Sequence, residues 1–224
     1  MSITVALVDD HTLVRRGIKL LIENLKDFTV IMEASNGKDF LDQIEVAIER
    51  PQIILMDVNM PVMGGLDTIK ILHSRYADLK IIALSVSTDM KNIREMIQAG
   101  SHAYLFKDAL PEVMHQVILQ VFEKGFYYDK FVIESLVKAE DTTSKKYRQQ
   151  NTVQLRHLQE SITGRELEFI KLCCTELPYK EIADQMDISI RTVDGYREAV
   201  FEKLSVKSRI GLVLFAVTSG LIEL

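Results

Sequence analysis

The sequence predicts an α/β domain with a five-stranded parallel sheet, followed by an all-α domain of four helices. Over residues 1–123, five short apolar runs alternate with five amphipathic stretches, the pattern of a parallel sheet with helices on both faces. Residues 158–224 contain only segments with helical periodicity. Residues 124–157 are polar and poor in core-forming residues, apart from a segment around Phe131–Val137, so we expect a partly helical linker.

The size and composition fit two modest folded domains. The chain has 224 residues, of which 47% are hydrophobic and 26% charged, as in folded globular proteins. No apolar run approaches the roughly 18–20 residues that span a bilayer, and the N-terminus lacks the basic region of a signal peptide. Two adjacent cysteines, Cys173 and Cys174, suit small buried residues better than a structural disulfide. We therefore expect a cytoplasmic protein.

The predicted strands are the five apolar runs, Ile3–Val8, Val30–Ala34, Ile53–Met56, Ile81–Leu84 and Ala103–Phe106. The predicted helices are Leu13–Leu25, Asp39–Ile48, Leu66–Tyr76, Met90–Ala99 and Leu110–Phe122. In the first of them, Val14, Ile18 and Leu25 fall on one helical stripe. Glycines at positions 37, 64, 65 and 100 mark the joins between elements.

The third strand ends in a carboxylate. Asp57 follows the wholly apolar run Ile53–Met56, and Pro61 and Gly64-Gly65 mark a loop directly after it. In open α/β sheets, functional sites lie beyond the carboxyl ends of the strands, which makes Asp57 a candidate functional residue. On this stretch alone, an Asp that caps the loop or the next helix is an equally good interpretation.

Other polar residues end the neighbouring strands. Asp9 and Asp10 follow the first strand, Ser85 the fourth and Lys107 the fifth, so we expect them to converge on Asp57. Three carboxylates in one pocket repel each other unless a cation neutralises them, and oxygen ligands suit Mg²⁺. A Lys ammonium suits a phosphate group. The set predicts a phosphoryl-transfer site with Asp57 as the nucleophile.

The ordered set of residues at these strand ends resembles a known family. It consists of Asp9-Asp10, Asp57, Met60-Pro61, Gly64-Gly65, Ser85 and Tyr104–Lys107. With this set, residues 1–123 resemble the receiver domain of two-component response regulators, which has the CheY-like (flavodoxin-like) fold. The resemblance implies that a sensor histidine kinase phosphorylates Asp57. It also implies that the chain is not an enzyme beyond its own phosphorylation and slow self-dephosphorylation.

The resemblance assigns a cofactor, Mg²⁺. Asp10, Asp57 and the backbone carbonyl of Asn59 would bind the ion directly, and Asp9 would bind it through water.

The resemblance also assigns a switch. Lys107 would pair with the phosphate on Asp57, Ser85 would move to hydrogen-bond that phosphate, and Tyr104 would turn inward behind Ser85. A new acyl phosphate adds charge and hydrogen-bond acceptors, so groups that can reach it are drawn towards it. An ordinary half-buried aromatic is the alternative interpretation of Tyr104.

The C-terminal segment predicts a helix-turn-helix. Thr163 and Glu166 have the spacing of a capping box at a helix start, and Pro178 can occupy the first turn of the next helix. A short helix, Lys180–Met186, then precedes a turn with Ser189 as the candidate cap of a longer helix, Ile190–Leu204. A fourth helix, Ser208–Ser219, ends at Gly220. A short helix, a turn and a longer helix, in this order, are typical of a helix-turn-helix.

Residues 160–222 resemble the LuxR-type domain of NarL/FixJ response regulators. The matching motifs are Ile162–Glu166, Lys180–Ala183, Ile188-Ser189, Thr192-Val193, Glu202–Leu204, Val206–Arg209 and Gly220–Ile222. The resemblance implies that Ile190–Leu204 is the recognition helix in the major groove of double-stranded promoter DNA. The last helix would pair two copies, with Leu212, Phe215, Ala216 and Ser219 as a candidate face, unless these residues pack within the domain.

The candidate DNA contacts are basic or hydroxyl side chains. They are Lys180, Arg191, Thr192, Arg197, Lys203 and Lys207, with Arg209 as a further member of the same basic rim. The sequence departs from the family after Thr192-Val193, where a Lys and, two residues later, a His are expected: Asp194, Gly195 and Tyr196 stand there instead, with Glu198 further on. Residues 158–224 carry eight Lys and Arg against eleven Asp and Glu, which is not a typical DNA-binding charge balance.

Three functions follow from these observations. The first is a DNA-binding transcription regulator controlled by phosphorylation, with a sensor kinase as partner and a homodimer as the phosphorylated form. The second is a phospho-aspartate switch that acts through protein–protein contacts, with weak or no DNA binding. The third is a phosphatase of the haloacid dehalogenase type, which Asp57–Asn59 superficially resembles but which would need a second Asp in place of Asn59. His11 adjoins the pocket, and we expect an ordinary surface histidine.

Overall fold

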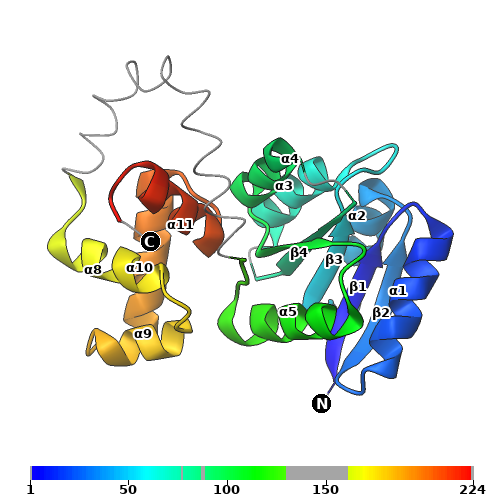
Figure 1. The fold of residues 1–224 in the computed structure, drawn as a ribbon, viewed down its shortest axis with the longest axis horizontal. Helices are drawn as coiled ribbons and strands as arrows, with labels where there is room; N and C mark the ends of the chain where they lie inside the picture. The colour runs from blue at the N-terminus through cyan, green and yellow to red at the C-terminus, as the bar shows by residue number, and fades with distance from the viewer. Residues whose placement is uncertain (1, 77, 87–88, 130–160, 223–224) are drawn as a thin grey trace. The chain divides into compact units, whose positions relative to one another are not determined.

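The computed structural model describes residues 2–76, 78–86, 89–129 and 161–222. The chain divides into two compact units, Met1–Tyr127 and Tyr128–Leu224 (Figure 1). The predicted linker from residue 130 onwards, including the expected helix near Phe131–Val137, lies outside the described residues. No helix in the described part of the chain is long and apolar enough to cross a membrane.

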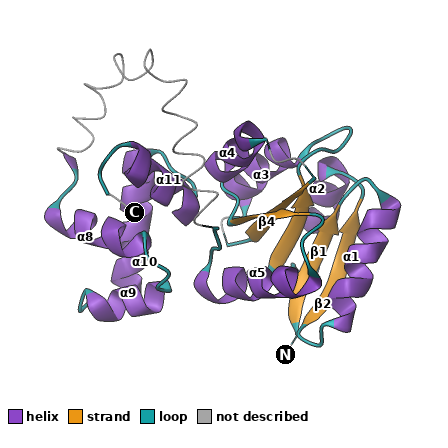
Figure 2. Cartoon of the chain, viewed as in Figure 1, coloured by secondary structure: helices purple, strands orange, loops and turns teal. Residues whose placement is uncertain are grey.

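The first unit is built on a five-stranded sheet in which every pairing is parallel, as predicted (Figure 2). The strands are β1 (Ile3–Val8), β2 (Phe28–Ala34), β3 (Ile53–Asp57), β4 (Lys80–Ser85) and β5 (Ala103–Phe106). Their order across the sheet is β2-β1-β3-β4-β5. Because β1 lies beside β3, and β4 and β5 follow, the carboxyl ends of these four strands meet at one edge.

Helices cover both faces of the sheet, which confirms the predicted α/β class. Helices α1 (Thr12–Asn24) and α5 (Pro111–Lys124) pack on one face, and α2 (Gly37–Val46), α3 (Gly65–Arg75) and α4 (Met90–Ala99) on the other. Strand β3 shows the reason: Ile53 and Leu55 point to the first face and Ile54 and Met56 to the second. A strand buried on both faces is apolar throughout, so its sequence does not show the alternation of apolar and polar residues that marks a half-exposed strand.

The second unit contains four described helices. They are α8 (Gly164–Cys173), α9 (Tyr179–Gln185), α10 (Ile190–Leu204) and α11 (Arg209–Thr218). The capping box of α8 is present. The Thr163 side chain accepts a hydrogen bond from the Glu166 backbone N–H, and the Glu166 side chain accepts one from the Thr163 backbone N–H. Ser189 caps α10 by accepting from Thr192. Pro178 is the N-cap residue of α9, one position before the first turn in which the sequence analysis placed it.

Helix α11 turns the expected pairing face towards its own domain. Leu212 and Ala216 are fully buried in a core with Phe169 and Val193, and Phe215 packs against the same core. Packing within the domain, the alternative stated above, therefore accounts for these three residues. The sequence could not separate the two interpretations because α11 is apolar around most of its circumference.

The two cysteines are free. Cys173 is buried in the core of the second unit, and Cys174 is partly buried. Burial raises the pKa of the Cys173 thiol to about 12 and that of Cys174 to about 11, so both are protonated near neutral pH. They behave as the small buried residues that the sequence predicted.

Candidate functional site

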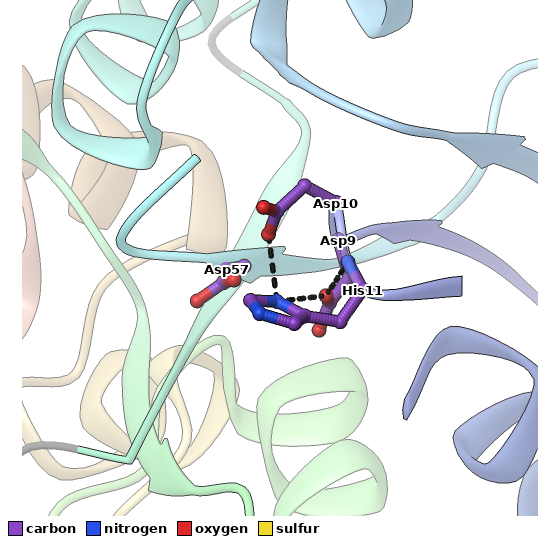
Figure 3. A group of neighbouring side chains, drawn as sticks. All are labelled: Asp9, Asp10, His11 and Asp57. Carbon is purple, nitrogen blue, oxygen red and sulfur yellow. Dashed lines mark hydrogen bonds and ion pairs between the residues drawn. The ribbon is translucent and has the colours of Figure 1, made fainter. Parts of the chain in front are cut away.

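Three carboxyl groups meet at the carboxyl edge of the sheet (Figure 3). Asp9 and Asp10 directly follow β1, and Asp57 is the last residue of β3. Asp9 is 2% exposed and Asp57 3% exposed, whereas Asp10 is partly exposed. Buried carboxylates need compensating partners, so the groups around them decide what this pocket can do.

Lys107 is the cation that faces the two buried carboxylates. Its Nζ lies 2.7 Å from Asp9 Oδ2 and 2.7 Å from Asp57 Oδ2. The residue directly follows β5, and its backbone N–H donates to the Ser85 carbonyl, which fixes its position beside β4. One ammonium balances only one of the charges, so with Asp10 the pocket keeps an excess of negative charge.

The pKa values reflect this balance. Burial raises the pKa of Asp57 above its ordinary 3.8, although the hydrogen bond from Lys107 acts in the opposite direction. Burial alone would lower the pKa of Lys107, but its hydrogen bonds to Asp57 and Asp9 raise the pKa above 10.5. Lys107 therefore stays charged, and a further cation in the pocket would favour the ionised form of Asp57.

The donor set of the pocket fits Mg²⁺. The Asp9, Asp10 and Asp57 carboxylates supply hard oxygen ligands, and ligand atoms of these residues and His11 all lie within 4.8 Å of one another. Asn59 is placed beside them, because its backbone N–H reaches Asp57 Oδ1 at 3.4 Å. An excess of buried negative charge that one Lys leaves uncompensated is the condition under which a divalent ion binds.

His11 is the exposed histidine beside the pocket that the sequence predicted, but its contacts with the carboxyl groups were not expected. Its Nδ1 lies 2.9 Å from Asp10 Oδ1, and its backbone N–H donates to Asp9 Oδ1 at 2.8 Å. Figure 3 shows the ring lying among the three carboxyl groups, although the side chain is 65% exposed. The sequence feature that could have indicated these contacts is the position of His11 directly after Asp10, at the turn from β1 into α1.

Arg15 is a second residue that the sequence analysis missed. From the first turns of α1, its guanidinium donates to the Asp9 backbone carbonyl, and its Nε lies 3.4 Å from Glu33 Oε2 on β2. Arg15 thereby ties the end of β1 to β2. It lies six positions beyond Asp9, and nothing in the local pattern distinguishes it from a surface arginine.

Ser85 and Tyr104, the predicted switch residues, are in contact. Ser85 is buried at the end of β4, and its hydroxyl shares a hydrogen bond with the Tyr104 phenol on β5. Burial raises the pKa of Tyr104 despite that bond. The ring also packs edge-on against Phe106, with 5.6 Å between ring centroids. A displacement of Ser85 would therefore change the surroundings of Tyr104.

The loop between β3 and α3 is held tightly against Asp57. Met63 N–H donates to the Pro61 carbonyl across Val62, whose φ is 68°, so Val62 is the centre of a strained γ-turn. Gly65 N–H donates to the Val58 carbonyl. A Cβ atom on Gly65 would lie 2.3 Å from the Asp57 carbonyl oxygen, so only glycine permits this approach.

We expect a Gly65→Ala substitution to destabilise the first unit by about 1–3 kcal/mol, because the new methyl group meets rigid backbone. Gly17→Ala is the matched control. Gly17 lies exposed within α1, and nothing lies within 4 Å of its added Cβ, so alanine there should stabilise by about 0.5–1 kcal/mol. Urea unfolding of both variants measures the difference. A Gly65→Ala variant as stable as Gly17→Ala would contradict the close approach.

In the second unit, four candidate DNA contacts are exposed. Arg191 and Thr192 occupy the first turn of α10, Lys180 the first turn of α9, and Lys207 precedes α11. Thr192 Oγ1 lies 2.9 Å from Ser189 Oγ, which holds it at the start of α10. These side chains are free to meet a ligand.

Two further candidates are held by acidic partners. Arg197 Nη1 lies 3.2 Å from Asp194 Oδ1, and its guanidinium lies 5.6 Å from the centroid of the Tyr179 ring. Lys203 Nζ donates to both carboxylate oxygens of Glu166 at 2.7 and 2.8 Å and to the Ser161 carbonyl at 3.0 Å. Either residue would have to leave these partners to reach DNA.

Arg209 does not belong to an exposed basic rim, so that expectation was wrong. The residue is 3% exposed. Its guanidinium donates to the carbonyls of Leu172, Cys173 and Thr175, at and just beyond the end of α8. It also lies 5.1 Å from the centroid of the Tyr179 ring. Arg209 thus satisfies carbonyls that the end of a helix leaves unpaired.

We expect Lys203→Met to destabilise the second unit by about 1–3 kcal/mol, because Glu166 is mostly buried and would lose its charged partner. Burial alone would raise the Glu166 pKa, but bonds from Lys203 and Thr163 lower it below its ordinary 4.5. Stability from this group is therefore present above pH 4.5 and lost as the pH falls further. Thermal unfolding between pH 3 and 7 should show a smaller acid loss in Lys203→Met than in wild type. Lys171→Met, at an exposed position of α8, should change neither quantity.

Comparisons with known proteins match both units. Residues 5–119 match the family described as response regulator receiver domain, and residues 160–216 match bacterial regulatory proteins of the luxR family. The response regulator UvrY of Escherichia coli K12 is 31% identical, with 98% of this chain and 95% of that protein covered. The response regulator GacA of Pseudomonas aeruginosa is 32% identical, over 99% of this chain and 98% of that protein. The nitrate/nitrite response regulator NarL of E. coli K12 is 32% identical, over 92% and 91%.

Solved structures share the fold at lower identity. RcsB from Salmonella typhimurium has a TM-score of 0.54 at 18% identity, covering 96% of this chain and 98% of that one. A complex of the response regulator RcsB with DNA has a TM-score of 0.55, also at 18% identity, covering 97% of this chain and 99% of that one. At these identities the likeness concerns the fold alone.

Proposed function

The chain belongs to the NarL/FixJ-type two-component response regulators, which join a receiver domain to a LuxR-type DNA-binding domain, and from this premise we propose that Asp57 is its phosphoacceptor. The observation that carries the proposal is the arrangement around Asp57. A buried carboxylate with raised pKa, a Lys that bridges it to Asp9, and a third carboxylate on Asp10 lie together at the edge of the sheet.

The phosphoryl donor is the phosphohistidine of a sensor histidine kinase. An oxygen of ionised Asp57 attacks the phosphorus, the bond from phosphorus to the donor imidazole breaks, and an acyl phosphate forms. Asp9, Asp10, Asp57 and the Asn59 carbonyl would hold Mg²⁺. When bound, the ion would offset negative charge on the phosphoryl oxygens. Lys107, already 2.7 Å from Asp57, contributes the protein's own positive charge.

Phosphorylation changes the charge at Asp57, and Ser85 and Tyr104 change position in response. The acyl phosphate carries about 1.5–2 negative charges in place of the single charge of the ionised carboxylate, and it adds new acceptors to the pocket. The Ser85 hydroxyl then exchanges its bond with Tyr104 for one with the phosphate, and Tyr104 follows it inward. The contact between these two residues supports this coupling.

The output is DNA binding by the second unit of a cytoplasmic homodimer. Arg191 and Thr192 contact DNA from the start of α10, with Lys180 and Lys207 on the phosphates. Arg197 and Lys203 contact DNA only after they leave Asp194 and Glu166. Two half-sites separated by a helical turn of DNA fit such a dimer.

DNA selection from random sequences tests this output, with and without an acyl-phosphate mimic. We expect wild type to enrich one motif, more strongly with the mimic, and Arg191→Ala to bind that motif about tenfold more weakly, the loss of about one good base or phosphate contact. Lys171→Ala removes another exposed charge, on α8, and should bind like wild type. No enrichment in either state would favour a switch that acts through protein–protein contacts, which the acidic residues of α10 also suit.

A further inference from the structure

One face of α10 is exposed along the whole helix. It consists of Arg191, Thr192, Gly195, Glu198, Ala199 and Glu202, spaced three and four positions apart. Val193, Val200 and Leu204 point the other way into the core. The exposed face is the part of the recognition helix that is available to a DNA groove.

The charge on this face is mostly negative. Asp194 and Arg197 neutralise each other at 3.2 Å beside it. Among the described residues, Glu198 and Glu202 form no ion pair, and Arg191 is the single cation of the face. Glu198 stands in the middle of the helix, so it is the long polar side chain best placed to reach a base.

Two neighbours of Glu198 on this face, Gly195 and Ala199, are small, and for Gly195 the packing of the domain gives no reason. Nothing lies within 4 Å of a Cβ atom added to Gly195, so the fold does not require glycine there. Glycine in a helix interior lowers stability relative to alanine. A surface hollow of about 340 Å³ lies beside Gly195 and Ala199. Small residues next to Glu198 allow the helix backbone to approach a partner closely.

A carboxylate can only accept hydrogen bonds, which restricts the base that it can contact. In the major groove, cytosine presents an amino donor, whereas adenine presents its amino group beside the N7 acceptor and guanine presents acceptors only. A carboxylate is therefore most favourable opposite cytosine. The surrounding phosphates repel it, so the contact contributes to sequence preference more than to general affinity.

We propose that Glu198 determines DNA specificity by accepting a hydrogen bond from the exocyclic amino group of a cytosine, with Gly195 and Ala199 permitting the approach. The inference rests on the proposed DNA-binding function. Glu198→Gln keeps the size of the side chain, removes the charge and adds a donor, so it should relax the preference for cytosine or shift it to adenine. It should also raise affinity for unrelated DNA, since one repulsion with phosphate is lost.

The test uses the DNA selected by the full-length wild-type protein. Dissociation constants are measured for that DNA and for a version in which the contacted cytosine is replaced by 2-pyrimidinone, which lacks the 4-amino group. We expect this replacement to weaken wild type about tenfold, the lower part of the range for a good base contact, and to leave Glu198→Ala, which has no acceptor, unaffected. Glu202→Ala, a matched truncation one turn further along, should retain the tenfold effect. Unfolding curves establish that the exposed substitutions leave the domain folded.

Two outcomes overturn the inference, and they are distinguishable. If wild type selects a motif but Glu198→Ala selects the same motif with the same penalty for 2-pyrimidinone, Glu198 does not contact a base and the DNA-binding function stands. If wild type selects no DNA with or without the acyl-phosphate mimic, the proposed function fails and the inference fails with it. The acidic face of α10 would then be expected to bind a basic protein instead of DNA.

Discussion

An Asp57→Asn variant incubated with acetyl phosphate and Mg²⁺ is expected to gain no phosphoryl group, whereas wild type gains one. The amide lacks the anionic oxygen that attacks phosphorus, and its loss also removes one ligand of the cation. Intact mass spectrometry measures the gain directly. The variant should remain folded, because Lys107 keeps its 2.7 Å contact with Asp9 and no longer faces a second charge.

The matched control for this variant is Asp67→Asn. Asp67 lies exposed on α3 and pairs only loosely with Lys70, at 3.5 Å. This substitution removes the same charge and should leave phosphoryl gain unchanged. Sedimentation of the same samples tests the homodimer, which should appear in wild type after phosphorylation and be absent from Asp57→Asn. A mass gain that survives in Asp57→Asn would show that another residue is the acceptor.

Arg209→Met is expected to destabilise the second unit by about 2–4 kcal/mol. The substitution removes the guanidinium donor from the carbonyls of Cys173 and Thr175, whereas the Leu172 carbonyl keeps its hydrogen bonds from the Thr175 N–H and hydroxyl. Each unsatisfied buried carbonyl costs about 1–3 kcal/mol, and small domains have total stabilities of only about 5–15 kcal/mol. Methionine retains most of the buried volume, so the effect reports the lost hydrogen bonds.

Lys207→Met is the control, because Lys207 is exposed and lies only two positions before Arg209. It should leave stability within about 0.5 kcal/mol of wild type and weaken only DNA binding. Urea unfolding gives the free energies, and amide hydrogen exchange locates the loss in α8 and α11. Equal stability of the two variants would show that the buried guanidinium is dispensable.

Prediction from the sequence was accurate where the signals are local. The sheet, its parallel order and the site at its edge were predictable, because buried parallel strands are apolar throughout and their ends carry the polar residues. Ile53–Met56 followed by Asp57 contains both signals within five residues. The capping box of Thr163 and Glu166 was equally local, since its bonds join residues three positions apart.

The choice of partner between distant residues was not predictable. Arg209 and Lys207 look alike in sequence, yet one is buried against α8, which lies more than 30 residues earlier. Lys203 is similar, since its partner Glu166 is 37 positions away. Leu212 and Ala216 carried an apolar stripe that suited a dimer as well as a core, and only packing against Phe169 assigned it.

The order of the elements and the chemistry available at the carboxyl edge of the sheet could therefore be predicted from the sequence. Both depend on periodicity and on residue types at strand ends, which are local properties of the chain. Which charged side chains pair with each other followed only from how the elements pack: Lys107 pairs with Asp9 and Asp57, and Arg197 with Asp194. The physical reason is that desolvation and ion pairing depend on which surfaces meet when elements pack, and that information is not local.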